Sequence, residues 1–244
     1  MFFHHLGEYI ILVASAFRKP EKASIYTRMT FAEMNKIGVE SIPIVIIVSV
    51  FMGAVTTIQT GYQLVAAWIP PSIIGGVVSE STILELSPTV TSLVLAGKIG
   101  SSISTELGTM RVSEQIDALE VMGIHSPTYL ILPKIIAAVI MFPILVTFSI
   151  ALSIGGGMLA GHYTGIVDQS QFLVGAREVF KTYSLIFSLT KACTFAFLIA
   201  TVSSYHGYYT SGGALGVGKS STKAVVYSSI AILFFDYILA QLFL

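Results

Sequence analysis

The sequence predicts an all-α, polytopic membrane protein with an N-terminal interfacial helix, five transmembrane helices, and a short helix between the second and third of them. Its 244 residues are 54% hydrophobic and only 11% charged, against about 25% charged residues in ordinary soluble domains. The mean hydropathy is +0.83, and residues 41–79 and 135–167 carry no charge at all. This composition argues against a soluble enzyme and against a disordered chain. The 13 basic and 13 acidic residues balance, so no nucleic-acid partner is expected.

Five stretches are long and apolar enough to cross a bilayer, whose hydrocarbon requires about 20 residues of helix. An uncharged turn around Trp68–Pro71 separates the first stretch from the second. Glu85 and Lys98 interrupt the second stretch, and the fourth and fifth contain one charge each, Lys191 and Asp236. The predicted spans are residues 43–66, 83–104, 134–160, 183–205 and 224–244.

Residues 1–40 are expected to lie at the cytoplasmic membrane surface, and residues 41–244 to form the five-helix membrane domain. Phe2–Phe17 is apolar but shorter than a span, and five basic residues interleaved with glutamates follow it. This mixture is typical of helices that lie in the interface. A cleaved signal segment is the alternative, although its basic start is missing.

The basic residues predict the orientation. With residues 1–40 placed inside, ten basic residues lie in or beside the inner segments and two in the outer ones. The positive-inside rule then gives a cytoplasmic N-terminus and a C-terminus on the opposite side, which requires an odd number of spans.

Between the second and third spans, about residues 105–123 have the pattern of a short amphipathic helix. Three acidic residues recur at every third position and so line one side of it. Ser113 is a candidate N-cap and Gly123 a candidate C-cap. Two interpretations are open: a solvated loop helix, or a coupling helix that enters a groove on a cytoplasmic motor protein. The acidic residues are Glu114, Asp117 and Glu120.

Several of these segments resemble the MlaE-type family of ABC transporter permeases. The resemblance covers about residues 40–244, and its most specific part is ELGTMRVSEQIDALEVMG at 106–123. Two positions depart from the family pattern. Ser87 stands where glycine is expected, and Lys98 stands where arginine is expected, which keeps the charge but loses the bidentate fork of a guanidinium. The other matching segments are ELSP (85–88), AGKIGS (96–101), GGALGVGKSSTKAVV (212–226) and DY (236–237).

The resemblance implies a homodimer in a bacterial inner membrane that transports phospholipids together with MCE-domain proteins. Two copies of a cytoplasmic ABC ATPase would bind ATP and magnesium, and a periplasmic ring of MCE proteins would sit on the outer side. This chain would then be a non-catalytic subunit, with no catalytic residue and no cofactor of its own. Because its five histidines show no ligand spacing, no metal is expected either.

Two groups of residues are the candidate sites. The residues expected to couple to the ATPase are Glu106, Arg111, Glu114, Gln115, Asp117 and Glu120. The residues expected along a lipid path are Thr56, Gln59, Glu85, Leu86, Lys98, Lys191 and Asp236. For Lys191 and Asp236 a structural ion pair between neighbouring helices is the alternative, and for the polar residues of the first span it is hydrogen bonding between helices. Gly157 and Gly161 are expected to allow close helix packing.

Residues Gly213–Ser220 read GALGVGKS and match the phosphate-binding loop of P-loop NTPases. That loop requires a preceding buried strand and a later acidic ligand for magnesium, whereas a predicted span lies on either side here. We therefore expect a tight cytoplasmic turn rather than a nucleotide site. Two other functions remain as alternatives: an ion-coupled secondary carrier that uses the charges within the spans, and a membrane scaffold without transport. A carrier often shows an internal repeat, and none is evident in this sequence.

Overall fold

The computed structural model describes residues 2–18, 23–64 and 70–243, and in these ranges it is helical with no strand. The all-α prediction is confirmed. The helical elements, in chain order, are α1 (Phe2–Ala16), α2 (Ala23–Ile37), η1 (Val39–Ser41), α3 (Ile42–Gln63), α4 (Ser72–Ser81), η2 (Thr82–Val90), α5 (Thr91–Leu95), η3 (Ala96–Gly100), α6 (Ser101–Val112), α7 (Gln115–Val121), α8 (Ser126–Tyr163), α9 (Gln169–Val179), α10 (Thr182–Tyr208) and α11 (Gly213–Phe243).

In the described part of the chain, five helical segments are long and apolar enough to cross a membrane, as predicted. Each is longer than its predicted span, because a helix does not have to end where the hydrocarbon ends. The fifth, for example, begins at Gly213 rather than near residue 224. The segments are Tyr26–Gln63, Ser72–Val112, Ser126–Tyr163, Thr182–Tyr208 and Gly213–Phe243.

The start of α11 corrects the interpretation of the glycine-rich motif. Gly212 and Gly213 have φ angles of 93° and 66° and form the expected turn. Gly216 and Gly218 do not belong to that turn, because both lie inside α11. Gly216 packs against the turn so closely that a Cβ there would lie 1.9 Å from the carbonyl oxygen of Ser211.

The second span is continuous but not uniformly α-helical. Thr82–Val90 and Ala96–Gly100 form two π-helical stretches, separated by the single α-helical turn of α5. The first contains Pro88, which has no N–H to donate to the preceding turn, so a wider hydrogen-bonding pattern is favoured there. Such π-helical stretches are frequent at functional sites, and Glu85 lies in the first of them.

Close packing of α3 against α8 depends on small residues. A Cβ on Gly53 would lie 1.8 Å from the carbonyl oxygen of Ser153, and one on Gly157 would lie 2.5 Å from Oγ1 of Thr57. Buried hydroxyl groups join the same two helices, since Ser153 Oγ donates to the carbonyl of Ser49 at 2.8 Å. The prediction that Gly157 and Gly161 serve helix packing is confirmed.

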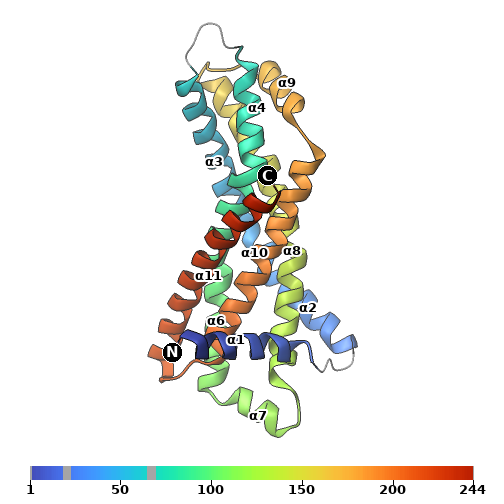
Figure 1. Cartoon of the computed structure of the whole chain (residues 1–244), viewed down its shortest axis with the longest axis vertical. Coiled ribbons are helices and arrows are strands. Elements are labelled where there is room, and N and C mark those ends of the chain that lie inside the picture. Colours follow the sequence, from blue (N-terminus) through green and yellow to red (C-terminus); the bar gives the residue numbers. More distant parts are fainter. Residues whose placement is uncertain (1, 19–22, 65–69, 244) are drawn as a thin grey trace.

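Short helices cover the two ends of the bundle (Figure 1). At the lower end, where α7 also lies, α1 runs across the long helices rather than along them. At the upper end α4 and α9 pack together, with Phe172 of α9 fully buried. The predicted third and fourth spans end at residue 160 and begin at residue 183, and no helix was predicted between them, so α9 was missed. We refer below to the α7 end and the α9 end of the molecule.

Candidate functional site

A charged cluster lies inside the bundle, where three helical elements meet. Lys191 of α10 is fully buried. Its ammonium nitrogen is 2.8 Å from Oδ1 of Asp236 on α11 and 2.6 Å from Oε1 of Glu85 on η2. It also donates to the carbonyl of Leu84 at 3.2 Å, and lies 4.7 Å from the ring centroid of Phe187. The expected pairing of Lys191 with Asp236 is present, and Glu85 is a second partner that the sequence did not reveal.

Exposure within this cluster is uneven. The side chains of Lys191 and Asp236 are 0% and 16% exposed, whereas the side chain of Glu85 is 44% exposed. The cluster is therefore open on the side of Glu85. Its two carboxylates outnumber the single ammonium, and charges within a membrane usually face a protein partner or a watered cavity. Leu86, the neighbour of Glu85, is half-buried.

The other expected lipid-path residues do not join this cluster. Lys98 donates to the backbone carbonyl of Glu40 and, at 3.1 Å, to the hydroxyl of Ser41. It therefore ties η3 to the turn that precedes α3. Thr56 donates its hydroxyl to the carbonyl of Met52 in its own helix at 2.8 Å, and Gln59 is exposed on α3.

The segment expected to be one coupling helix is a helical hairpin at the α7 end. The α6 helix continues to Val112, and Glu114 begins α7 in the left-handed region, with a φ of 58°. Ser113 does not cap α7, which corrects the prediction, because its hydroxyl instead donates backwards to the carbonyl of Thr109 at 2.7 Å. Gly123 has a φ of 79° and ends the helix as predicted, with two hydrogen bonds typical of a Schellman motif.

The three acidic residues of this segment have different surroundings. Asp117 forms an ion pair with Arg111 at 2.5 Å. Glu120 accepts hydrogen bonds from Ser126 Oγ at 2.7 Å and from Tyr208 OH at 3.0 Å, so it faces the bundle. Glu114 is exposed. All three acidic side chains are exposed on the α7 segment, beside exposed Gln115, Val121 and Met122, but Asp117 and Glu120 are engaged by the partners just named.

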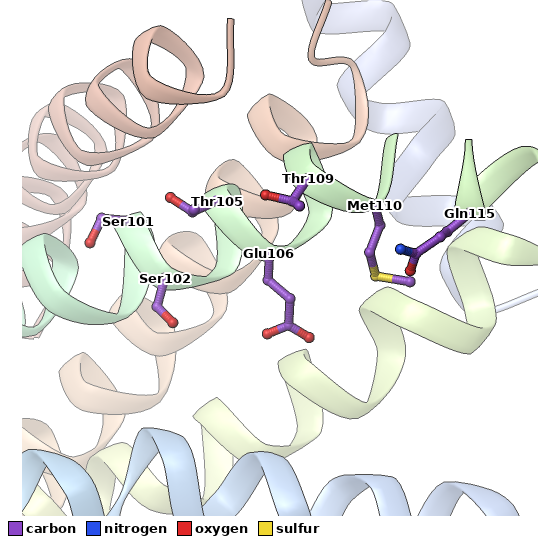
Figure 2. Close-up of a pocket in the computed structure, with 7 residues that line it drawn as sticks. All are labelled: Ser101, Ser102, Thr105, Glu106, Thr109, Met110 and Gln115. Carbon is purple, nitrogen blue, oxygen red and sulfur yellow. The ribbon is translucent and has the colours of Figure 1, made fainter. Parts of the chain in front are cut away.

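Glu106 lies away from α7, in an ion-pair network between helices. The Glu106 carboxylate lies 2.9 Å from the ammonium of Lys134, which is buried, and 3.4 Å from the ammonium of Lys36, which is exposed. Lys134 also pairs with Glu33 at 2.8 Å. These contacts join α6 to α2 and α8. Figure 2 shows Glu106 and Ser102 on one side of α6, and the hydroxyl side chains of Ser101, Thr105 and Thr109 on the other. An open cavity of about 560 Å³ lies here. The cavity is lined by Ser101, Ser102, Thr105, Glu106, Thr109, Met110 and Gln115.

The end of α10 near α7 contacts both α1 and the α7 segment, which the sequence did not predict. Tyr208 contacts Glu120, and its ring lies 6.0 Å from the Arg111 guanidinium. One turn earlier, Tyr205 donates to Glu8 of α1 at 3.0 Å. Tyr9, whose pKa burial raises above the ordinary value, contacts Thr201 at 2.8 Å. The only sequence indication was a group of tyrosines at the end of an apolar span, which resembles an interfacial aromatic belt.

Among the residues that the structure describes, one group of side chains has spacing compatible with a metal ion. Glu8 Oε2 is 3.4 Å from Nδ1 of both His4 and His5. This group was not predicted from the sequence, because His4 and His5 are adjacent and the third ligand lies one helical turn away. Both histidines are exposed, and the Tyr205 hydroxyl already bridges His5 and Glu8 at 2.9 and 3.0 Å.

Five long apolar helices, charges paired inside the bundle and a short helix between the second and third spans are the features of a polytopic helical membrane protein. The chain belongs to the MlaE permease family, because the family described as Permease MlaE matches residues 30–242. It is thus a permease of the ABC transporter type, a membrane subunit. Such a subunit works with an ATPase, which argues against the ion-coupled carrier considered above.

Curated relatives carry names consistent with this family. A probable ABC transporter permease protein of Rickettsia bellii is 38% identical over 240 residues, which cover 98% of this chain and 92% of the relative. The intermembrane phospholipid transport system permease protein MlaE of Haemophilus influenzae is 29% identical, with 99% and 92% covered. Protein TRIGALACTOSYLDIACYLGLYCEROL 1, chloroplastic, of Arabidopsis thaliana is 33% identical, with 91% and 63% covered.

Proposed function

We propose that this chain is the membrane subunit of an ATP-driven transporter that moves phospholipids between the inner membrane and an assembly of MCE-domain proteins. The observation that carries the proposal is the cluster around Lys191. A buried ammonium shared by two carboxylates, one of them 44% exposed, offers groups of both signs to a zwitterionic or anionic headgroup. A lipid phosphate competes with Glu85 for Lys191, and a headgroup amine competes with Lys191 for Glu85.

The ATPase contact is assigned to the outward surface of α7. Glu114, Val121 and Met122 are exposed there, and an exposed apolar patch beside a charge is typical of a protein-binding surface. The Arg111–Asp117 pair and the Glu120–Tyr208 hydrogen bond attach α7 to the bundle. In this proposal the α7 end and the N-terminus are cytoplasmic, and ATP with magnesium binds to two copies of the separate ATPase.

The uncovered face of α3 supports a homodimer as part of this proposal. Gln59 and Gln63 lie one turn apart on this face, and both are exposed within an apolar span. Amide groups inside a membrane require hydrogen-bond partners. A second copy of the chain and the lipid path between the two copies would supply them. The MCE ring would then sit over the α9 end, around the mouth of that path.

A co-purification experiment tests this function. The tagged chain, extracted in mild detergent, is expected to bring with it an ABC ATPase and an MCE-domain protein. After reconstitution, ATP should drive movement of a fluorescent phospholipid between the vesicles and the MCE protein. A complex that contains both partners and hydrolyses ATP without moving any phospholipid would refute the substrate assignment. Absence of an ATPase from the purified material would refute the coupling.

A further inference from the structure

An open groove of about 530 Å³ runs along the first half of α11, on the N-terminal side of Asp236, and none of its lining residues belongs to the Lys191 cluster. We propose that this groove binds an anionic phospholipid, with its headgroup on two lysines and the upper part of an acyl chain on the apolar residues beyond them. The groove is lined by Lys219, Thr222, Lys223, Val226, Tyr227 and Ile230.

Helix length places the two lysines at the membrane surface. Residues 224–243 of α11 contain one charged residue, Asp236, which is paired with Lys191. At about 1.5 Å per residue this stretch is about 30 Å long, the thickness of the hydrocarbon core. Lys219 and Lys223 precede the stretch directly, so they lie at the level of the lipid headgroups.

The lysines are available for a phosphate. They are four residues apart on one helix and therefore on one face, about 6 Å apart at their β-carbons. Both are exposed, and neither forms an ion pair with any residue that the structure describes. The lining of the groove contains no acidic side chain. Two ammonium groups without a counter-charge thus point toward an anionic ligand.

The rest of the groove changes in polarity in the order that a phospholipid does. Tyr227 follows the lysines by one turn, and its ring stacks on His206 with centroids 5.1 Å apart and planes 21° apart. Tyrosine is enriched at this depth of a membrane. Val226 and Ile230, which are 49% and 57% exposed, then offer an apolar surface to an acyl chain.

Charge also favours a lipid over a second copy of the chain at this face. In a two-fold contact the same surface lies on both sides, so this face of α11 would set lysines opposite lysines. The sole acidic residue of α11 is Asp236, which Lys191 already engages. Lys219 is the lysine of the apparent nucleotide-binding motif, and here we assign it a lipid phosphate instead.

A fluorescence experiment on the chain in bilayers tests this site. The sequence has a single tryptophan, Trp68, so the double variant Trp68→Phe/Tyr227→Trp reports from the groove. Phosphatidylglycerol brominated near the headgroup end of its acyl chain is expected to quench this tryptophan more strongly than phosphatidylcholine brominated at the same position. A lysine near an anionic lipid contributes about 1 kcal/mol. Lys219→Gln and Lys223→Gln should therefore each lower the phosphatidylglycerol preference about five-fold.

A control variant removes two positive charges at the α9 end of the molecule. Arg177 and Lys181 are exposed there, and changing both to glutamine should leave the preference at the reporter unchanged. Equal quenching by the two lipids, an equal loss in the control, or no quenching by either lipid would each overturn the proposal. The assay contains no ATPase and measures no transport, so its outcome is separate from that of the proposed function.

Discussion

Removal of single charges from the Lys191 cluster should destabilise the protein in a fixed order. Lys191→Met leaves two carboxylates facing each other, and breaking a buried ion pair costs about 3–5 kcal/mol. Asp236→Leu leaves Lys191 bound to Glu85 at 2.6 Å, so the loss should be about 1.5–3 kcal/mol, the value of one hydrogen bond to a charged group. Glu85→Gln should cost less than about 1 kcal/mol, because that side chain is 44% exposed and solvent screens its charge.

Thermal unfolding of the detergent-solubilised chain measures this order. With a shift of about 2–4 °C per kcal/mol for a chain of this size, Lys191→Met should lower Tm by about 6–20 °C. The double variant Lys191→Met/Asp236→Leu should be more stable than Lys191→Met alone, because the remaining Glu85 reaches solvent. Additive losses in the double variant would refute the pairing. An equal loss in Asp236→Leu and Lys191→Met would refute the sharing of Lys191 between two acids. In the double variant transport should recover only in part, because Lys191 is the group proposed to bind the lipid phosphate.

Three further predictions concern other parts of the molecule. Glu114→Lys should weaken ATPase binding in a pull-down while Tm stays unchanged, because Glu114 is exposed; unchanged binding would contradict the assignment of the α7 surface. The purified chain alone should bind no fluorescent ATP analogue, because residues 214–220 are helical; saturable binding that Lys219→Ala abolishes would restore the nucleotide site. Gln59→Cys in a Cys193→Ser background should cross-link two copies under oxidation, and failure while Tyr163→Cys cross-links would place the dimer contact elsewhere.

The sequence predicted the spans because the membrane imposes a simple rule on composition. Every backbone group must be satisfied within a helix, and charges are costly, so charge-free stretches reveal the helices that cross. The ends of those helices were less predictable. Ser113 had the chemistry of an N-cap, yet α6 continues to Val112 and Glu114 supplies the turn. Likewise α9 was missed, because its burial depends on contacts with α4 that are distant in sequence.

The pairing of charges was predictable only in part, for a physical reason. A fully buried lysine requires an acid, and Asp236 was the sole acid in the neighbouring span, so that pair could be inferred by elimination. Glu85 was also a possible partner of Lys191, but the direction of its side chain could not be predicted. The π-helical turns of η2 rotate that side chain relative to an α-helical register. Lys98, inside the second span, has other partners. The carbonyl of Glu40 and the hydroxyl of Ser41, at the turn before α3, accept its hydrogen bonds. Backbone and hydroxyl groups therefore satisfy Lys98, whereas the fully buried Lys191 is paired with two carboxylates.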